Sequence, residues 1–310
     1  MSQPLTITQK QARAWLVSGQ GLSQPFGSPE EAVQSLFAVQ TQYAASLGVA
    51  IATRVRRMKP AWPDSAFNKN PTLVKTWSLR STLHAHLVED RALVKAFCKP
   101  RYEQFLGWMK SYNMAPGQML FRENEILEAL ENGPLTRPQI HDAVPELKSL
   151  DWSGWGADVK GLAYKGHVIL APCGPGQTRF VLARQWLGSE PDDSLSFEDA
   201  LVEILRRYLH SHAPATISDF AYWTGIKAVS TRAAFARVKP ELIPVEIEKL
   251  EGTRYVLAED AERLQQLPAA TGVRLLAKFD GALGRPLHRD PQTVPSCTAT
   301  GINSNVLPMA

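Results

Sequence analysis

Apolar residues in the segment 28–48 recur at the three- and four-residue spacing of a helix with one inward face. This face comprises Ala32, Val33, Leu36, Phe37, Val39 and Ala44. Ser28 can cap such a helix, Pro29 suits its first turn, and Glu31 stands three residues after Ser28, the order of a capping box. The pattern predicts a well-capped helix that begins at Ser28 and ends near Gln40-Thr41-Gln42.

Gln40 and Gln42 stand two residues apart at the end of this helix. Residues at that spacing share no helix face, but in an extended or turning segment both side chains can point to one side of the backbone. Two interpretations are open. The amides are solvated helix residues, which these three letters alone favour, or they form a paired polar site.

Residues 75–87 alternate between apolar and polar side chains, which predicts a strand. One face carries Trp77, Leu79, Ser81, Leu83, Ala85 and Leu87. The other face carries Arg80, Thr82, His84 and His86. This polar face fits a strand that lines a site or faces phosphate, and it fits almost equally well the solvated side of a sheet.

A basic cluster lies at the end of the segment 47–57 and just beyond it. It comprises Arg54, Arg56, Arg57 and Lys59. In a helix, Arg54 and Arg57 lie on the same side, where they can contact phosphate. A solvated surface explains the cluster at least as well.

The chain repeats itself between residues 123 and 258. Each copy begins with a helix and passes through a Pro-x-Thr step, at 134–136 and at 214–216, into two further helices. A hairpin follows in each copy. The two hairpins end in similar sequences, Thr178-Arg179-Phe180-Val181-Leu182-Ala183 and Thr253-Arg254-Tyr255-Val256-Leu257-Ala258. Helix, turn, helix, helix and hairpin is the order of a winged helix.

We therefore predict a mainly α protein with small β wings, of the α+β class, built from tandem winged-helix domains. Residues 1–115 are expected to form an N-terminal winged-helix-like domain that carries the Gln pair. The second and third winged helices are expected over 116–190 and 191–265. Residues 266–310 are expected to form a truncated or atypical C-terminal β segment and tail.

Several elements outside the repeat are expected from the same patterns. They are a helix over 5–22 capped by Thr8, a short helix over 71–74, helices over 89–97 and 101–112, and a strand over 273–280. Residues 291–310 contain no Asp, Glu, Lys or Arg and show no periodicity. This tail is expected to be irregular, without the final sheet.

Composition narrows the class of protein. At 310 residues the chain can bury two or three small cores, and its hydrophobic content of 44%, charged content of 21% and net charge of +4 are compatible with nucleic acid without indicating it. Cys98, Cys173 and Cys297 form no C-x-x-C pair, so neither a zinc nor a redox site is supported. The chain shows neither a signal-peptide pattern nor an apolar run of about 18 residues, so we expect a cytoplasmic protein without membrane contact.

Four features, in chain order, resemble the HTH_42-type winged-helix family, which includes the AlkZ/YcaQ-like DNA glycosylases. They are Gln40-Thr41-Gln42, Arg80-Ser81-Thr82-Leu83-His84, the doubled repeat and Phe279-Asp280. The family pattern is Q-apolar-Q or Q-apolar-D followed by R-G-T-L-H. Here Thr41 replaces the apolar or small residue and Ser81 replaces the Gly. The resemblance covers about residues 5–285.

The resemblance implies a DNA-repair glycosylase in which Gln40 and Gln42 hold the attacking water and Asp280 supports the site. The residues then expected to contact DNA are Arg80, Thr82, His84, Arg54 and Arg57. With Gln and not Asp at position 42, the implied substrates are N7-alkylguanine adducts or interstrand crosslinks in double-stranded DNA. Neither a metal nor an organic cofactor is implied, and we expect a monomer that is associated with the nucleoid when bound to DNA.

The alternative is a non-catalytic tandem winged-helix protein that binds DNA in a regulatory role. Such regulators commonly dimerise over symmetric half-sites, and the chain shows no dimerisation heptad. Release of a damaged base from duplex DNA distinguishes the two hypotheses.

Overall fold

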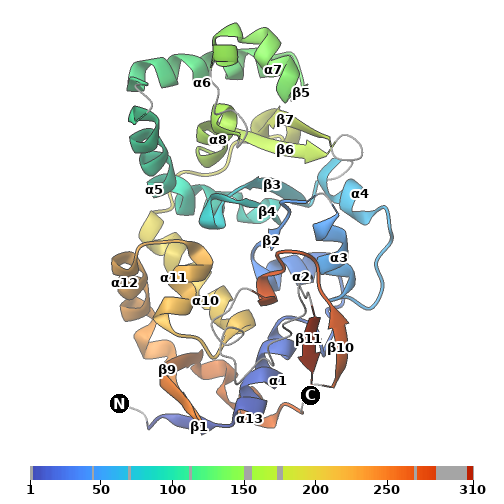
Figure 1. Ribbon diagram of the computed structural model, residues 1–310, viewed down its shortest axis with the longest axis vertical. Helices are drawn as coiled ribbons and strands as arrows, with labels where there is room; N and C mark the ends of the chain where they lie inside the picture. Colours follow the sequence, from blue (N-terminus) through green and yellow to red (C-terminus); the bar gives the residue numbers. More distant parts are fainter. Residues whose placement is uncertain are drawn as a thin grey trace, which may run out of the picture. The chain divides into compact units, whose positions relative to one another are not determined.

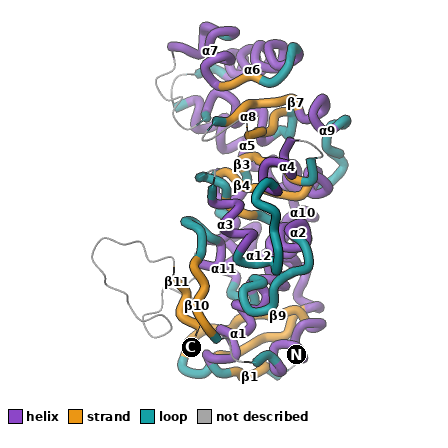
Figure 2. The backbone as a smooth tube through the Cα atoms, turned by 90° about the vertical axis from the view of Figure 1, so that its right-hand side faces the viewer, coloured by secondary structure: helices purple, strands orange, loops and turns teal. Residues whose placement is uncertain are grey.

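The computed structural model describes residues 3–43, 45–68, 71–111, 114–149, 156–172, 177–268, 271–283 and 306–309 (Figures 1 and 2). The expected mixed α+β class is confirmed. The chain divides into two compact units: unit 1 comprises Met1–Pro60 with Leu201–Ala310, and unit 2 comprises Ala61–Ala200. The domain boundaries predicted at 115, 190 and 265 differ from the boundaries of these units, and they stay a prediction.

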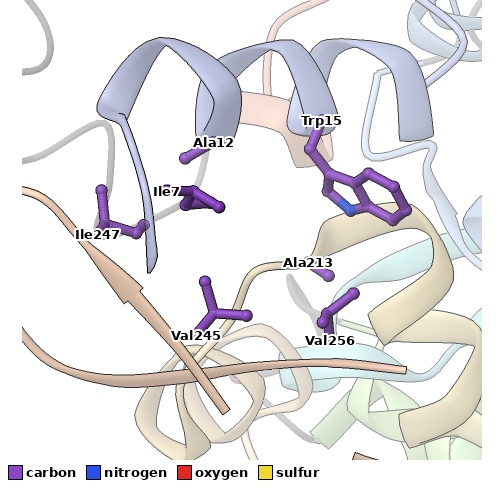
Figure 3. Packing of buried hydrophobic residues seen from close by; sticks show 7 residues of the cluster. All are labelled: Ile7, Ala12, Trp15, Ala213, Val245, Ile247 and Val256. Atoms are coloured by element: carbon purple, nitrogen blue, oxygen red, sulfur yellow. The ribbon is translucent and has the colours of Figure 1, made fainter. Parts of the chain in front are cut away.

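Unit 1 begins with a strand and a helix that close one end of its core. β1 (Leu5–Ile7) pairs in parallel with β8 (Leu242–Ile247), and α1 (Gln9–Gly19) follows. Thr8 caps α1 as predicted, with its Oγ1 accepting from the backbone N–H of Gln11 at 3.2 Å. The helix starts later than predicted because Leu5–Ile7 finds a strand partner more than two hundred residues away. Figure 3 shows the core between them, formed by Ile7, Ala12, Trp15, Ala213, Val245, Ile247 and Val256.

α2 (Pro29–Leu36) confirms the predicted capping and is shorter than predicted. Ser28 Oγ accepts from the backbone N–H of Glu31 at 3.1 Å, and the Glu31 carboxylate accepts from the N–H of Gly27 at 2.8 Å. The helix stops at Leu36 because Phe37 adopts a φ of +61° with its side chain buried. The turn at Phe37 leads the chain into the short strand β2 (Val39–Gln40).

Burial alternates along and just past β2. Val39 and Thr41 are buried, Gln40 is half-buried and Gln42 is exposed. This period of two puts the two Gln side chains on the outer side of an extended segment and Thr41 on the inner side. The Oγ1 of Thr41 is buried, and no partner for it occurs in the described part of the chain. The inner position therefore suits an apolar side chain better than a hydroxyl.

The C-terminal segment of unit 1 is held to α3 (Ser46–Ala52) by a buried ion pair. Arg54 Nη1 donates to Asp280 Oδ2 at 2.8 Å, and Nη2 donates to Asp280 Oδ1 at 2.6 Å. Both side chains are 1% exposed. Arg54 Nη1 also donates to the carbonyl of Ala50 at 2.8 Å. Around the pair, Leu276 and Ala282 pack against Val17 and Leu22.

The second copy of the sequence repeat forms the rest of unit 1. Its elements are α10 (Phe197–His212), α11 (Ile217–Thr224), α12 (Ala228–Val238), β8 and β9 (Leu250–Leu257), with α13 (Ala261–Gln266) after them. Phe220 and Trp223 are buried in the aromatic core, whereas Tyr222 is exposed. Strand order in this sheet is β1-β8-β9.

Unit 2 carries the first copy of the repeat on a hairpin and a long helix. It comprises α4 (Trp62–Asn68), β3 (Leu73–Trp77), β4 (Leu83–Leu87), α5 (Arg91–Lys110), α6 (Pro116–Glu131), β5 (Leu135–Thr136), α7 (Arg137–Ala143), α8 (Ala157–Tyr164), β6 (Val168–Pro172), β7 (Thr178–Leu182) and α9 (Ala183–Leu187). Its strands are hydrogen-bonded in the order β4-β3-β6-β7-β5.

Three predictions for unit 2 are wrong. The single strand over 75–87 is an antiparallel hairpin, in which Lys75 pairs with Ala85 and a turn replaces its centre. Residues 73 and 74 belong to β3, so the predicted helix over 71–74 does not form. The two helices expected over 89–97 and 101–112 are one helix, α5, which continues through Pro100.

The two copies of the repeat have the same strand register. Leu135 of the first Pro-x-Thr step pairs with Phe180, and Ala215 of the second pairs with Tyr255. The Thr of each step then precedes a helix as its N-cap: Thr136 N donates to Gln139 Oε1 at 2.8 Å and Thr216 N to Asp219 Oδ2 at 2.7 Å. The predicted repeat is therefore confirmed at the level of backbone pairing.

The C-terminal segment has a shorter first strand than predicted and a second strand that was not predicted. The strand expected over 273–280 is limited to β10 (Gly272–Leu275). β10 pairs antiparallel with β11 (Val306–Met309), side by side in Figure 2, so the prediction of an irregular tail without a sheet is wrong for these residues. Residues 284–305 of the predicted tail lie outside the described residues.

We expect Asp280→Asn to lower the free energy of unfolding by about 3–5 kcal/mol, because it leaves the buried Arg54 guanidinium without its counter-charge. Urea titration followed by circular dichroism measures this change. Glu241→Gln is the matched control, since its ion pair with Arg206 is solvent-exposed and should contribute less than about 1 kcal/mol. Equal effects of the two substitutions would contradict the account.

We expect Thr41→Val to raise the free energy of unfolding by about 1 kcal/mol, because it replaces a buried hydroxyl by a methyl group of similar shape. Thr41→Ser keeps the hydroxyl and loses the methyl group, so it should be destabilising. The same urea titration checks both variants, and a Val variant less stable than the wild type would show that the hydroxyl is satisfied.

Candidate functional site

Gln40 and Gln42 present their amides from the extended segment that follows α2. Two features position them: the cap at Ser28 starts the helix, and the left-handed turn at Phe37 ends it. The Phe37 ring packs on Trp223, with the ring centroids 6.4 Å apart, which anchors this turn to α11. Of the two interpretations left open by the sequence, the helical one is excluded, because α2 ends at Leu36 and Gln40 ends a short strand.

Gln40 lines a small pocket inside unit 1. The pocket walls come from Gln20, Leu36, Ala38, Val39, Gln40, Ala50, Arg54, His212, Trp223, Ala277, Lys278, Asp280 and Gly281. About 20 Å³ of its volume can hold the centre of a water molecule. That volume is enough for one or two waters when the walls carry polar groups, and Gln20, Gln40 and His212 supply such groups.

Gln20 and His212 are site residues that sequence reasoning missed. Gln20 is buried, and its Nε2 donates to the carbonyl of Ser211 at 2.9 Å. Its Oε1 is buried and has no partner within the described ranges. The contact requires α1 and α10 to approach closely, and a Cβ added at Gly19 would lie 2.9 Å from the Ser211 carbonyl oxygen. No sequence pattern marked either residue, since each stands at the end of an ordinary amphipathic helix.

His212 is fixed in orientation by its neighbours. Its Nδ1 lies 2.7 Å from Ser211 Oγ, and its ring stacks on Tyr208 at a centroid distance of 4.7 Å. Trp223 lies against both rings, 4.9 Å from Tyr208 and 5.4 Å from His212. The core of the second repeat copy therefore forms one wall of the pocket.

The structure places Arg54 and Asp280 together and separates Arg54 from Arg57. Asp280 lines the pocket, and its supporting role in the site stays a prediction. Arg54 is buried in the ion pair, so the predicted phosphate contact by Arg54 is wrong. α3 ends before both residues, so they do not share a helix face, and Arg57 is exposed.

Residues 78–82 form a tight turn between β3 and β4 in unit 2. Arg80 and Ser81 have φ angles of +51° and +57°, a left-handed conformation that glycine adopts most easily. The turn is closed by the Ser78 N–H, which donates to the Thr82 carbonyl at 3.1 Å. Arg101 Nη1 donates to Ser81 Oγ at 3.3 Å. Arg80 and Thr82 are half-buried at its surface.

His84 was predicted on the polar face of a strand, but it does not face solvent. Its side chain is buried in β4, and its Nδ1 donates to the Thr82 carbonyl at 3.0 Å. Burial lowers the pKa of His84 well below its usual value, and the charges of His86 and Arg80 lower it further. His84 is therefore neutral near pH 7 and supports the turn from inside, so its predicted contact with DNA is wrong.

The arrangement around Gln40 can orient a water molecule without a metal. Each amide offers one carbonyl acceptor and one NH₂ donor that keep their character across the physiological pH range. Among the described residues, no group of three or more His, Cys, Asp or Glu side chains could hold a metal ion.

None of the helices in the described ranges is long and apolar enough to cross a membrane.

Comparison with known proteins finds DNA glycosylases. A curated relative from Streptomyces sahachiroi, named interstrand DNA cross-link repair glycosylase, is 28% identical over 306 residues, which span 91% of this chain and 78% of that protein. The solved structure of the Streptomyces sahachiroi DNA glycosylase AlkZ has the same fold, with a TM-score of 0.77 at 24% identity, over 89% of this chain and 77% of that one.

A family model described as DNA glycosylase AlkZ-like matches residues 33–286. The matched range contains the Gln pair, the turn at 78–82, both copies of the repeat and the buried Arg54–Asp280 pair. Since the match extends over most of the sequence, the chain belongs to the AlkZ-like family of DNA glycosylases.

Proposed function

We propose that this protein removes N7-alkylguanine from duplex DNA, including guanines joined in an interstrand crosslink, with water held by Gln40 and Gln42. One observation carries the proposal: Gln40 lines a water-sized pocket with polar groups in its wall, and the exposed Gln42 follows it two residues later. Membership of a glycosylase family and similarity to the interstrand DNA cross-link repair glycosylase of Streptomyces sahachiroi support the substrate class.

The chemistry of the lesion explains why two neutral amides suffice. Alkylation at N7 gives guanine a positive charge, so the base departs readily and the sugar develops oxocarbenium character. A strong general base is then not required. Fixed dipoles that orient the attacking water and stabilise the developing charge contribute most of the acceleration.

The pocket supports this scheme because its polar groups are held in place. The amide of Gln20 is fixed through its Nε2, so its Oε1 can accept a hydrogen bond from a water that also contacts Gln40. The His212 ring is fixed by Ser211 and Tyr208. A preorganised polar wall loses little free energy to reorganisation when the reaction occurs.

The two repeat copies supply a scaffold that we propose to be tandem winged helices. In the second copy the third helix, α12, carries the exposed Arg232, and the exposed Lys227 and Lys239 flank its two ends. In the first copy the corresponding helix, α8, is almost wholly buried. The second copy is therefore the better candidate for contact with the DNA backbone, together with Arg57 and the turn that presents Arg80.

We expect Gln40→Ala and Gln42→Ala each to lower the single-turnover rate of base release by about 100- to 1000-fold, the range for loss of one preorganised polar group. The substrate is a duplex with one N7-methylguanine, and the freed base is measured by chromatography. Gln34→Ala, an exposed residue of α2, is the control and should leave the rate unchanged.

If both variants release the base at the wild-type rate, Gln40 and Gln42 do not carry out the chemistry. No release by the wild type, with salt-dependent binding to undamaged duplex, would instead support the non-catalytic DNA-binding alternative. A separate duplex with an N7-guanine crosslink tests whether the substrate class extends to two joined strands.

We expect Arg57→Gln and Arg80→Gln each to make the dependence of log K for duplex binding on log salt less steep by about 0.9, the value of one lost phosphate contact. Titrations between low and moderate salt, followed by fluorescence anisotropy, measure the slope. Arg206→Gln should not change it, because Arg206 is already paired with Glu241. An unaltered slope in Arg57→Gln and Arg80→Gln would place the phosphate contacts elsewhere.

A further inference from the structure

Two exposed aromatic rings and one lysine form a cluster next to the Gln pair in unit 1. Tyr43 and Phe279 are 48% and 47% exposed. Their rings stack with centroids 5.7 Å apart and planes 15° apart. Lys278 Nζ lies 4.9 Å from the Tyr43 ring centroid and 5.4 Å from that of Phe279, and it donates to the Tyr43 hydroxyl at 3.3 Å. We call these three residues the aromatic cluster.

The cluster is joined to the candidate site along both of its chain segments. Tyr43 directly follows Gln42, and Phe279 directly precedes Asp280. Lys278 lines the same pocket as Gln40. If a nucleotide lies at the Gln pair, the part of the DNA that contacts the two rings therefore belongs to the same bound duplex.

Phe279 is held in a conformation that a bulky residue rarely adopts. Its φ is +63°, in the left-handed region. The next residue fixes it there, because the Asp280 N–H donates to the Ala277 carbonyl at 3.0 Å and the Asp280 carboxylate is locked to Arg54. Glycine would occupy this position without strain. A strained, half-exposed phenyl ring is the kind of feature that is retained for binding at the expense of stability.

We propose that the Tyr43–Phe279 pair extends its stack onto one undamaged nucleobase of the duplex that neighbours the lesion nucleotide. This inference rests on the proposed glycosylase function. Aromatic side chains bind bases through their faces without regard to sequence, which suits an enzyme that must act wherever damage occurs. Because the lesion nucleotide itself occupies the Gln pair in the proposed function, the base that reaches the adjacent rings is that of a neighbouring nucleotide.

The first test compares ring removal with matched controls. Phe279→Gly and Tyr43→Ala should each weaken binding to a 2′-fluoro-stabilised N7-methylguanine duplex by about 5- to 100-fold. Phe121→Ala removes a ring elsewhere that is 55% exposed, and it should leave binding unchanged. Phe279→Tyr and Tyr43→Phe keep a ring and should bind like the wild type.

Two further readouts separate stacking from a structural effect. Because Phe279→Gly relieves the left-handed strain, its Tm should stay within about 4 °C of the wild type while binding is lost. The slope of log K against log salt should also stay unchanged, because a stacking contact releases no counterions. A lowered slope would show that the variant has disturbed the phosphate contacts, and it would overturn the proposal.

The occupant is identified with duplexes that lack one base. Two duplexes carry an abasic analogue on the 5′ or the 3′ side of the lesion. On one of them the wild type and Phe279→Gly should bind equally, because the base that stacks has gone. A full difference on both duplexes would contradict the proposal. If the wild type releases no base from a cleavable duplex, the glycosylase function has failed; if it releases base and ring removal changes nothing, only this inference has failed.

Discussion

The buried ion pair between Arg54 and Asp280 is the interaction on which the candidate site depends. It joins the chain just after α3 to the segment 276–283, more than two hundred residues later, through two charge-assisted hydrogen bonds away from water. Those two stretches, with the extended segment after α2, form three sides of the pocket beside Gln40. A buried pair contributes little net stability over an apolar contact of the same shape, but its geometry is specific, and breaking it is costly. The pair thereby holds Asp280 in the pocket wall and Phe279 in its left-handed conformation next to the Gln pair.

The remaining wall of the pocket is formed by the second copy of the repeat. Both copies have the same strand register and the same Thr-capped helix after the Pro-x-Thr step. The second copy, in unit 1, meets the end of α1, where Gln20 donates to the Ser211 carbonyl. The aromatic core that stabilises this copy, through Tyr208 and Trp223, also fixes the ring of His212. Packing that serves the fold thus also preorganises the polar wall proposed to hold water.

Local patterns in the sequence predicted local structure well. The caps at Thr8 and Ser28 and the doubled repeat all depend on residues close together in the chain, and each was confirmed. The failures have a common cause, which is contact over long sequence distance. Arg54 appeared to belong to a basic surface because its partner Asp280 is remote, and Leu5–Ile7 appeared helical because β8 lies near the other end of unit 1. The alternation over 75–87 predicted one strand instead of a hairpin, because the sequence does not indicate the turn. Arg80 and Ser81 have positive φ angles there, and neither is a glycine. His84 was assigned to a polar face by the same alternation, although it is buried beneath the turn.

The most direct test of this account is the rate of base release by Asp280→Asn under conditions where circular dichroism shows the variant to be folded. This substitution leaves Gln40 and Gln42 unchanged and removes only the charge that anchors the segment 276–283 to Arg54. The account predicts a loss of about a hundredfold in single-turnover release of N7-methylguanine, the size expected when a site is displaced by about an ångström. A folded Asp280→Asn protein that releases the base at the wild-type rate would show that the ion pair serves the fold alone and that the Gln pair is positioned without it.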